Sequence, residues 1–281
     1  MPPTVDSLSR SVPFFVMPAS SPLRLWLPLA GLLLLAPPEP ACAQPAPPPD
    51  TLASALTTVD RLRAQGKFEA ALSRLDHLAR THPTRVDVLW RRALMLSDLG
   101  RAHRNTAPED TTIARHRRAL AVARRVCELD STSAWGHMVT ALAAGRLTLH
   151  VKRGDRVRYS RLVKRHADRT IALDSTLAPA FHLRGRWHRK VADINLFKRA
   201  LAKAIYGGLP DASFDRSIHN FKRAIALESK PYNHLELAKT YLKIGRDSTA
   251  RAQLHRALHT TGSPFEDEHH REARALLDRL D

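Results

Sequence analysis

The chain has 281 residues, of which 43% are hydrophobic and only 6% aromatic, and its formal net charge is +18. This length suits one or two ordinary domains, and the abundance of Ala, Leu and Arg favours helices over strands. The sequence contains no glycine-rich phosphate loop, no Gly-x-Ser-x-Gly motif and no His-Glu-x-x-His motif, so enzymes of those classes are not expected.

The positive charge is unevenly distributed. Residues 101–203 contain 23 Lys and Arg against 8 Asp and Glu. A field of this sign attracts polyanions, such as anionic lipid headgroups. The alternative is that Arg, which outnumbers Lys by 35 to 10, covers solvated helix faces and needs no partner.

The N-terminus has the features of a signal peptide, which we place at residues 1–43. Arg24 precedes an apolar stretch at 25–36, and Ala41-Cys42-Ala43 forms a small-x-small cleavage site before Gln44. Twelve apolar residues are fewer than the roughly 20 that a membrane-spanning helix needs. We therefore expect an exported protein, periplasmic or secreted. The alternatives are a lipidated Cys42 and an uncleaved N-terminal anchor.

Residues 44–50 include four prolines and are expected to form an extended linker. The repeat domain then covers 51–281. Its first helices are predicted at 52–64 and 69–81, joined by a turn at Gly66, and the next helix runs over 86–99.

Gly100 follows Gly66 after 34 residues, the period of the tetratricopeptide repeat. We therefore predict an all-α fold, a tetratricopeptide-like right-handed α-solenoid. It should contain about five helix pairs and a C-terminal capping helix at 264–280.

A phrase recurs where successive helices end: Leu129-Asp130-Ser131, Leu173-Asp174-Ser175 and Leu227-Glu228-Ser229. The spacings between these copies exceed 34 residues. The excess includes 149–155 and 191–197 and predicts lengthened helices with kinked starts in the middle units. A turn is expected at 207–211, where two glycines permit positive φ and Pro210 cannot continue a helix.

Small residues at helix crossings let the two helices of each unit pack closely. The predicted repeat-packing positions are Gly66, Ala71, Gly100, Ala119, Gly185, Ala238, Tyr241, Gly245, Ala250 and Ala257.

Two groups of residues are candidates for ligand binding. In the first, Arg158, Arg161 and Arg165 share one helix face, with Arg169 one turn further on, and such a stripe can follow phosphates. Its alternative is a solvated outer face. The second is a groove around a surplus helix, where an aromatic side chain and basic residues would hold a peptide or an acyl chain; the alternative is that its aromatic residues belong to the core. Its members are Arg186, Trp187, Lys198 and Lys203.

Neither cysteine chemistry nor a metal site is expected. Cys127 lies among apolar residues and is interpreted as a small buried hydrophobe rather than a nucleophile. The acidic and His-containing run at 266–270 has the composition of a chelator, but acidic residues in a first turn also complement the helix dipole. We expect no cofactor.

Four stretches carry a resemblance to a known family: 183–188 with its Gly-Arg-Trp sequence, 197–204, 206–214 with the Gly-Gly-Leu-Pro turn, and 237–245. Together they resemble the regulator-of-microtubule-dynamics family of tetratricopeptide-like proteins. Trp135 with 141–147, and 166–175, look like its upstream part. The resemblance covers residues 74–280 and is strongest over 178–257.

This resemblance implies a helical interaction domain without enzymatic chemistry, whose animal relatives are linked with microtubules and organelle membranes. We expect a protein or peptide partner on the concave face. An envelope lipid-binding or lipid-carrying protein is the alternative and a microtubule-associated protein a second one; nucleic acid is not an expected partner.

Overall fold

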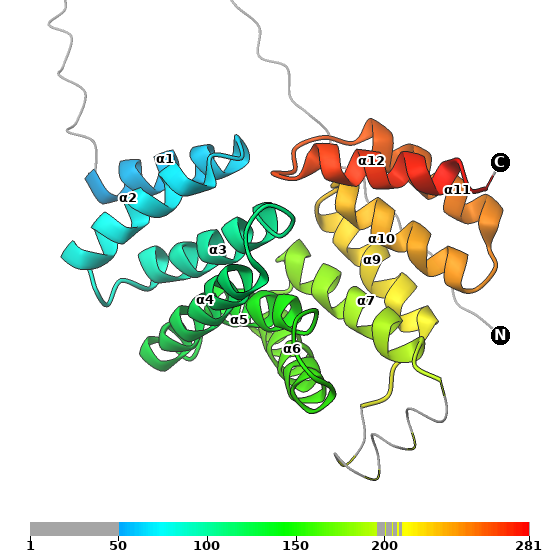
Figure 1. The fold of residues 1–281 in the computed structure, drawn as a ribbon, viewed down its shortest axis with the longest axis horizontal. Helices are drawn as coiled ribbons and strands as arrows, with labels where there is room; N and C mark the ends of the chain where they lie inside the picture. Colours follow the sequence, from blue (N-terminus) through cyan, green and yellow to red (C-terminus); the bar gives the residue numbers. More distant parts are fainter. Residues whose placement is uncertain (1–50, 196–199, 201–203, 205–206, 208–209, 281) are drawn as a thin grey trace, which may run out of the picture. The chain divides into compact units, whose positions relative to one another are not determined.

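The computed structural model describes residues 51–195, 200, 204, 207 and 210–280, all within the unit Pro47–Asp281. In this part of the chain the regular elements are α-helices, which confirms the predicted all-α class (Figure 1). They are α1 (Thr51–Ala64), α2 (Phe68–Thr81), α3 (Val86–Ala102), α4 (Glu109–Leu129), α5 (Ala134–Leu147), α6 (Arg153–Leu173), α7 (Ala178–Ala192), α9 (Phe214–Leu227), α10 (Pro231–Lys243), α11 (Asp247–His259) and α12 (Glu266–Leu277).

The helices pack as consecutive pairs. The pairs are α1 with α2, α3 with α4, α5 with α6, α7 with α9, and α10 with α11, and α12 packs on the last pair. The first helices of successive units also touch, as α3 with α5, α5 with α7, and α7 with α10. This is the predicted solenoid of five helix pairs with a capping helix.

The recurring phrase at the helix ends has the same local structure in each copy. The amide N–H groups of Asp130, Asp174 and Glu228 each donate to the carbonyl four residues earlier at 2.8 Å, which closes α4, α6 and α9. In the two Asp copies the carboxylate also accepts from the backbone N–H two residues on at 2.8 Å, forming a turn. The repetition in the sequence is therefore a repeated helix stop.

Part of the extra length of the middle units comes from longer helices. Helices α4 and α6 have 21 residues each, whereas α2 has 14 and α11 has 13. Of the predicted extra segments, 149–152 is a turn before α6 rather than a helix, and α7 ends at Ala192. Residues 196–197 lie outside the described part.

The small residues lie at helix crossings as expected. Ala71, Ala119, Ala238, Ala250 and Ala257 are all 0% exposed, and Tyr241 is 5% exposed. A Cβ on Gly100 would lie 2.6 Å from the His116 ring, and one on Gly185 would lie 3.0 Å from Phe221. Only glycine fits these two crossings without a shift of the neighbouring ring.

Gly66 and Gly245 have a different role from packing. Their φ angles are 73° and 69°, and a Cβ at either would meet nothing within 4 Å. Both residues make the left-handed turn between the two helices of a unit, a conformation that L side chains rarely adopt.

The core consists of three hydrophobic clusters. Buried side chains of α1, α2, α3 and α5 form one cluster, and those of α9, α10, α11 and α12 form another at the far end. Between them α4, α5, α6 and α7 share a third. Among the described helices, none is both long and apolar enough to cross a bilayer.

Candidate functional site

A cleft of about 780 Å³ opens along the first helices of the units. Its walls come from α1, α3, α5, α7 and α10, and from α12 with the segment before it. Each repeat therefore contributes one helix to the same surface, so residues far apart in the sequence meet there.

The cleft has an apolar floor. Leu94, Met138, Leu142 and Leu183 line it, together with Trp135, whose ring stacks on Trp90 at 4.4 Å between centroids. Such a surface can accommodate apolar side chains or an aliphatic chain.

The charges around this floor are balanced, with seven acidic and seven basic residues among the lining side chains. Asp98, on α3, is 1% exposed. Its carboxylate accepts from Arg63 at 2.8 Å and from Arg146 at 2.7 Å. Burial alone would raise the pKa of Asp98, but the two guanidinium groups hold it below its usual value.

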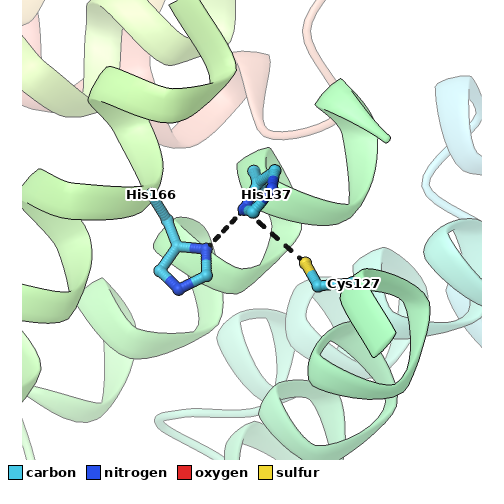
Figure 2. A group of neighbouring side chains, drawn as sticks. All are labelled: Cys127, His137 and His166. Atoms are coloured by element: carbon cyan, nitrogen blue, oxygen red, sulfur yellow. Dashed lines mark hydrogen bonds between the residues drawn. The ribbon is translucent and has the colours of Figure 1, made fainter. Parts of the chain in front are cut away.

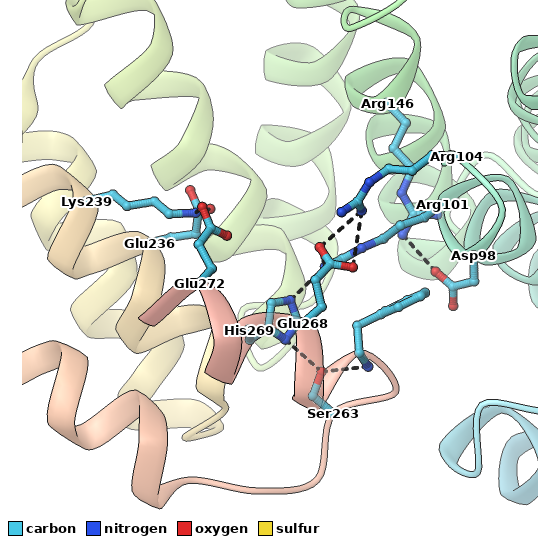
Figure 3. Close-up of polar contacts among 11 residues, drawn as sticks. Asp98, Arg101, Arg104, Arg146, Glu236, Lys239, Ser263, Glu268, His269 and Glu272 are labelled. Carbon is cyan, nitrogen blue, oxygen red and sulfur yellow. Dashed lines mark hydrogen bonds and ion pairs between the residues drawn. The ribbon is translucent and has the colours of Figure 1, made fainter. Parts of the chain in front are cut away.

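Glu236, on α10, is the second buried acid of the cleft. It pairs with Arg189, with Lys239 at 3.0 Å, and with Arg186 at 3.5 Å. These charges outweigh burial and hold the pKa of Glu236 well below its usual range. Lys239 also contacts Glu272 of α12 at 2.7 Å, which ties the capping helix to this cluster (Figure 3).

Three histidines that line the cleft are held in the neutral form. Burial lowers the pKa of His116, His182 and His269 to about 3, and neighbouring Arg146, Arg186 and Arg101, respectively, add to this effect. The positive charge of the cleft therefore comes from its Arg and Lys residues.

The C-terminal segment closes the cleft against the first two units (Figure 3). Glu268 accepts from Arg101 at 2.9 Å and from Arg104 at 3.1 Å. Phe265 stacks on Phe68 with centroids 5.1 Å apart, and the Arg101 guanidinium lies 4.1 Å from its ring centroid. In the acidic run at 266–270, Glu268 and His269 thus contact Arg101 of α3, while Asp267 is exposed in the first turn of α12.

A second depression, of about 840 Å³, lies on the face of α6. Arg158, Arg161 and Arg165 line it together with Arg124 of α4. Its apolar part is Val157, Tyr159, Leu162 and Pro210. Arg169 is exposed on α6 but does not line the depression.

The second predicted group does not form one site. Trp187 is 4% exposed, and its indole N–H donates to the carbonyl of Ser160 at 2.9 Å, so it belongs to the core, which was the alternative interpretation. Arg186 lines the central cleft. Lys198 and Lys203 lie outside the described residues.

The sequence prediction missed Asp98, Arg101 and Glu268. The sequence could have indicated Asp98, because it is an acidic residue within the largely apolar run 93–99. A charged residue at a core position usually has a buried partner. Away from the cleft it also missed Cys127, His137 and His166, whose ligand atoms all lie within 4.8 Å of one another. In the described residues this is the one group with the spacing of a metal site.

Comparisons with known proteins agree with this architecture. A thermophilic TPR protein in Thermus thermophilus covers 80% of this chain and 98% of its own, with a TM-score of 0.58 and 21% identity. At this identity the likeness concerns the fold alone.

Two curated relatives are regulator of microtubule dynamics protein 1 of Pongo abelii and of Bos taurus. The first is 24% identical over 65% of this chain and 63% of the relative, and the second is 26% identical over 56% and 50%. Regulator of microtubule dynamics protein 2 of Macaca fascicularis is 26% identical over 69% of this chain and 48% of that protein. The chain therefore spans about half to two thirds of the length of these relatives.

The model of the regulator of microtubule dynamics protein 1-3 family matches residues 55–281, which is most of the chain and includes every helix that lines the cleft. The chain is a helical repeat scaffold, and it belongs to the regulator of microtubule dynamics protein 1-3 family.

Proposed function

We propose that the protein is a non-enzymatic scaffold that binds an extended peptide segment of a partner protein in the cleft of its first helices. The observation that carries this proposal is the segment 262–265, which lines the cleft together with the helices. This segment supports the proposal, because it is a non-helical stretch of chain that packs beside the first helices.

The contacts of Phe265 and Glu268 suggest which chemistry would suit a partner segment. An aromatic ring sits between Phe68 and Arg101, and a carboxylate meets Arg101 and Arg104. The remaining floor is apolar and its charges are balanced, which suits a peptide of mixed sequence better than a polyanion. We expect a partner segment with an aromatic residue followed by acidic residues.

Selection of peptides from a displayed library against the full chain tests this proposal. We expect peptides with micromolar affinity that lose at least tenfold in Arg186→Ala, because Arg186 lines the cleft and its side chain is 41% exposed. Arg169→Ala removes the same charge outside the cleft and is the control. Equal affinity in both variants, or no selected peptide, would contradict binding in the cleft.

Binding of an anionic lipid surface is the second candidate, and the depression on α6 favours it. Three arginines of α6 and one of α4 surround apolar side chains there, the combination that attracts acidic headgroups beside acyl chains. Flotation with vesicles containing phosphatidylglycerol is the test. Binding that disappears as salt rises is expected, and no binding at low salt would exclude it.

Export through a cleaved signal at residues 1–43 remains part of the proposal. The supporting features are the short apolar stretch and the Ala41-Cys42-Ala43 site. N-terminal sequencing of the protein from its natural source should find Gln44 first. A start before residue 25 would contradict cleavage and would favour the second alternative, a microtubule-associated protein, which co-sedimentation with microtubules can test.

A further inference from the structure

Cys127, His137 and His166 come from three different helices and converge at one point between the second and third repeats. Cys127 lies in the last turn of α4, His137 in the first turn of α5 and His166 in α6. Figure 2 shows the His137 ring between the other two side chains. The Nδ1 atom of His137 lies 3.7 Å from Cys127 Sγ and 2.8 Å from His166 Nδ1.

We propose that these three residues form a Zn²⁺ site that joins α4, α5 and α6. One sulfur and two imidazole nitrogens are the donor set that zinc prefers over the oxygen ligands of calcium or magnesium. All three side chains are half-buried, so an ion from solvent can reach them.

The distances fit a tetrahedral ion after a small adjustment. Zn–S bonds of about 2.3 Å and Zn–N bonds of about 2.0 Å place sulfur and nitrogen roughly 3.6 Å apart and two nitrogens roughly 3.3 Å apart. The Sγ–Nδ1 distance already matches at 3.7 Å. The two nitrogens at 2.8 Å share a hydrogen bond in which His166 Nδ1 is the donor. Opening them by about half an ångström makes room for the ion, and the proton of His166 moves through solvent from Nδ1 to Nε2 of the same ring.

The surroundings of His137 orient it as a ligand. Its Nε2 lies 3.1 Å from the carbonyl oxygen of Ser131, which can only accept, so Nε2 carries the hydrogen. Nδ1 of the neutral ring is then a lone pair that faces Cys127 and His166. A backbone carbonyl on the other ring nitrogen is the usual outer-shell partner of a zinc-bound histidine.

Cys127 would bind as its thiolate. Burial raises the pKa of the free thiol, so the proton leaves to solvent as the Zn–S bond forms, and the thiolate offsets one charge of the ion. The hydroxyl of Thr140, which lies 3.8 Å from Sγ, donates to the carbonyl of Gly136. Three protein ligands leave the fourth position of the ion for water.

Titration of the reduced, metal-free full chain with Co²⁺, followed by displacement with Zn²⁺, tests the site. We expect one equivalent of Co²⁺ to give a thiolate-to-cobalt charge-transfer band and tetrahedral d–d bands. Zn²⁺ at 100 times its dissociation constant should raise Tm by about 5 to 10 °C.

Cys127→Ser and His166→Ala should lose the charge-transfer band or weaken binding at least tenfold. Cys42→Ala removes the other cysteine and should leave both readouts unchanged. The proposal is overturned if the wild-type protein shows no charge-transfer band, or if the band survives in Cys127→Ser. Circular dichroism verifies that each variant is folded, and either of the two site variants suffices for the comparison.

Discussion

The central cleft and the depression on α6 are both surrounded by arginine, but they use it in opposite ways. The cleft is lined by equal numbers of acidic and basic residues. The buried carboxylates of Asp98 and Glu236 each pair with at least two cationic side chains. Around the depression the lining residues include four arginines and no acid. The first region uses buried charge to hold repeats together, whereas the arginines of the second are exposed at the surface.

This difference shows that the large positive charge of residues 101–203 does not describe the central cleft. Part of this charge lies outside the cleft, on Arg117 and Arg118 of α4 and Arg165 of α6, all of them exposed. A peptide in the cleft and an anion on α6 would therefore respond differently to salt, since screening acts most strongly on exposed charges.

The largest expected effect comes from Asp98→Ala. The substitution leaves Arg146, whose side chain is 14% exposed, without its carboxylate partner. We expect a loss of about 3 to 5 kcal/mol in the free energy of unfolding, measured with urea. Asp155→Ala breaks the exposed pair with Arg158 near the depression and should cost less than about 1 kcal/mol. Similar losses in the two variants would remove the distinction between the regions.

Gly100→Ala should have the next largest effect, because the new methyl group would lie 2.6 Å from the buried ring of His116 behind the cleft. Overpacking of this kind costs about 1 to 3 kcal/mol. Gly145→Ala in α5 meets only Val163 at 3.6 Å and should stabilise by about 0.5 to 1 kcal/mol through helix propensity. Thermal unfolding should show a lower Tm for Gly100→Ala and a higher Tm for Gly145→Ala. A higher Tm for Gly100→Ala would contradict the close packing of α3 on His116.

The neutral histidines of the cleft give a prediction on acid sensitivity. The pKa of His269 is about 3 in the folded protein, lowered by burial and by Arg101, against about 6.5 in an unfolded chain. Between these values only the unfolded state binds the proton, so stability should fall as pH falls from about 6.5, by up to about 1.4 kcal/mol per pH unit.

His269→Gln should make this slope shallower. Urea unfolding at pH 7.5 measures how much the substitution itself changes the free energy of unfolding. Repeating the measurement down to pH 5 gives the dependence of that free energy on pH. An unchanged slope would mean that His269 does not stay neutral in the fold. Below pH 5 the carboxylates of Asp98 and Glu236 add to the loss, because their pKa values are depressed and the unfolded chain takes up their protons first.

The smallest effect on stability is expected at the depression. Arg158→Gln with Arg165→Gln should change the free energy of unfolding by less than about 0.5 kcal/mol, since both side chains are exposed. The same variant should lose about 30-fold in affinity for anionic vesicles, at about 1 kcal/mol for each arginine. The control is the double variant Arg117→Gln with Arg118→Gln, which removes the same amount of charge on α4, outside the depression. This control should bind anionic vesicles as the wild type does. Equal losses in both pairs would indicate attraction by net charge without a site.

The sequence was sufficient for the repeat architecture, because the features that specify it are local. The Gly66 turn, the Asp130 and Asp174 helix stops, and Ala71 or Ala250 at helix crossings each act within one unit. They could be found by period and turn chemistry, without knowledge of how the units stack. Gly100 follows Gly66 after 34 residues but lies within α3, so this spacing does not repeat the turn.

The candidate sites depend on stacking and could only be found in the tertiary structure. Arg101 and Glu268 are 167 residues apart, and His137 and His166 are 29 apart on different helices. Small rotations between repeats decide whether such side chains meet, and no pattern within one repeat records those rotations. The sequence alone determined that the chain folds as stacked helix pairs. The tertiary packing decided which charges face each other across the cleft and which remain on the surface.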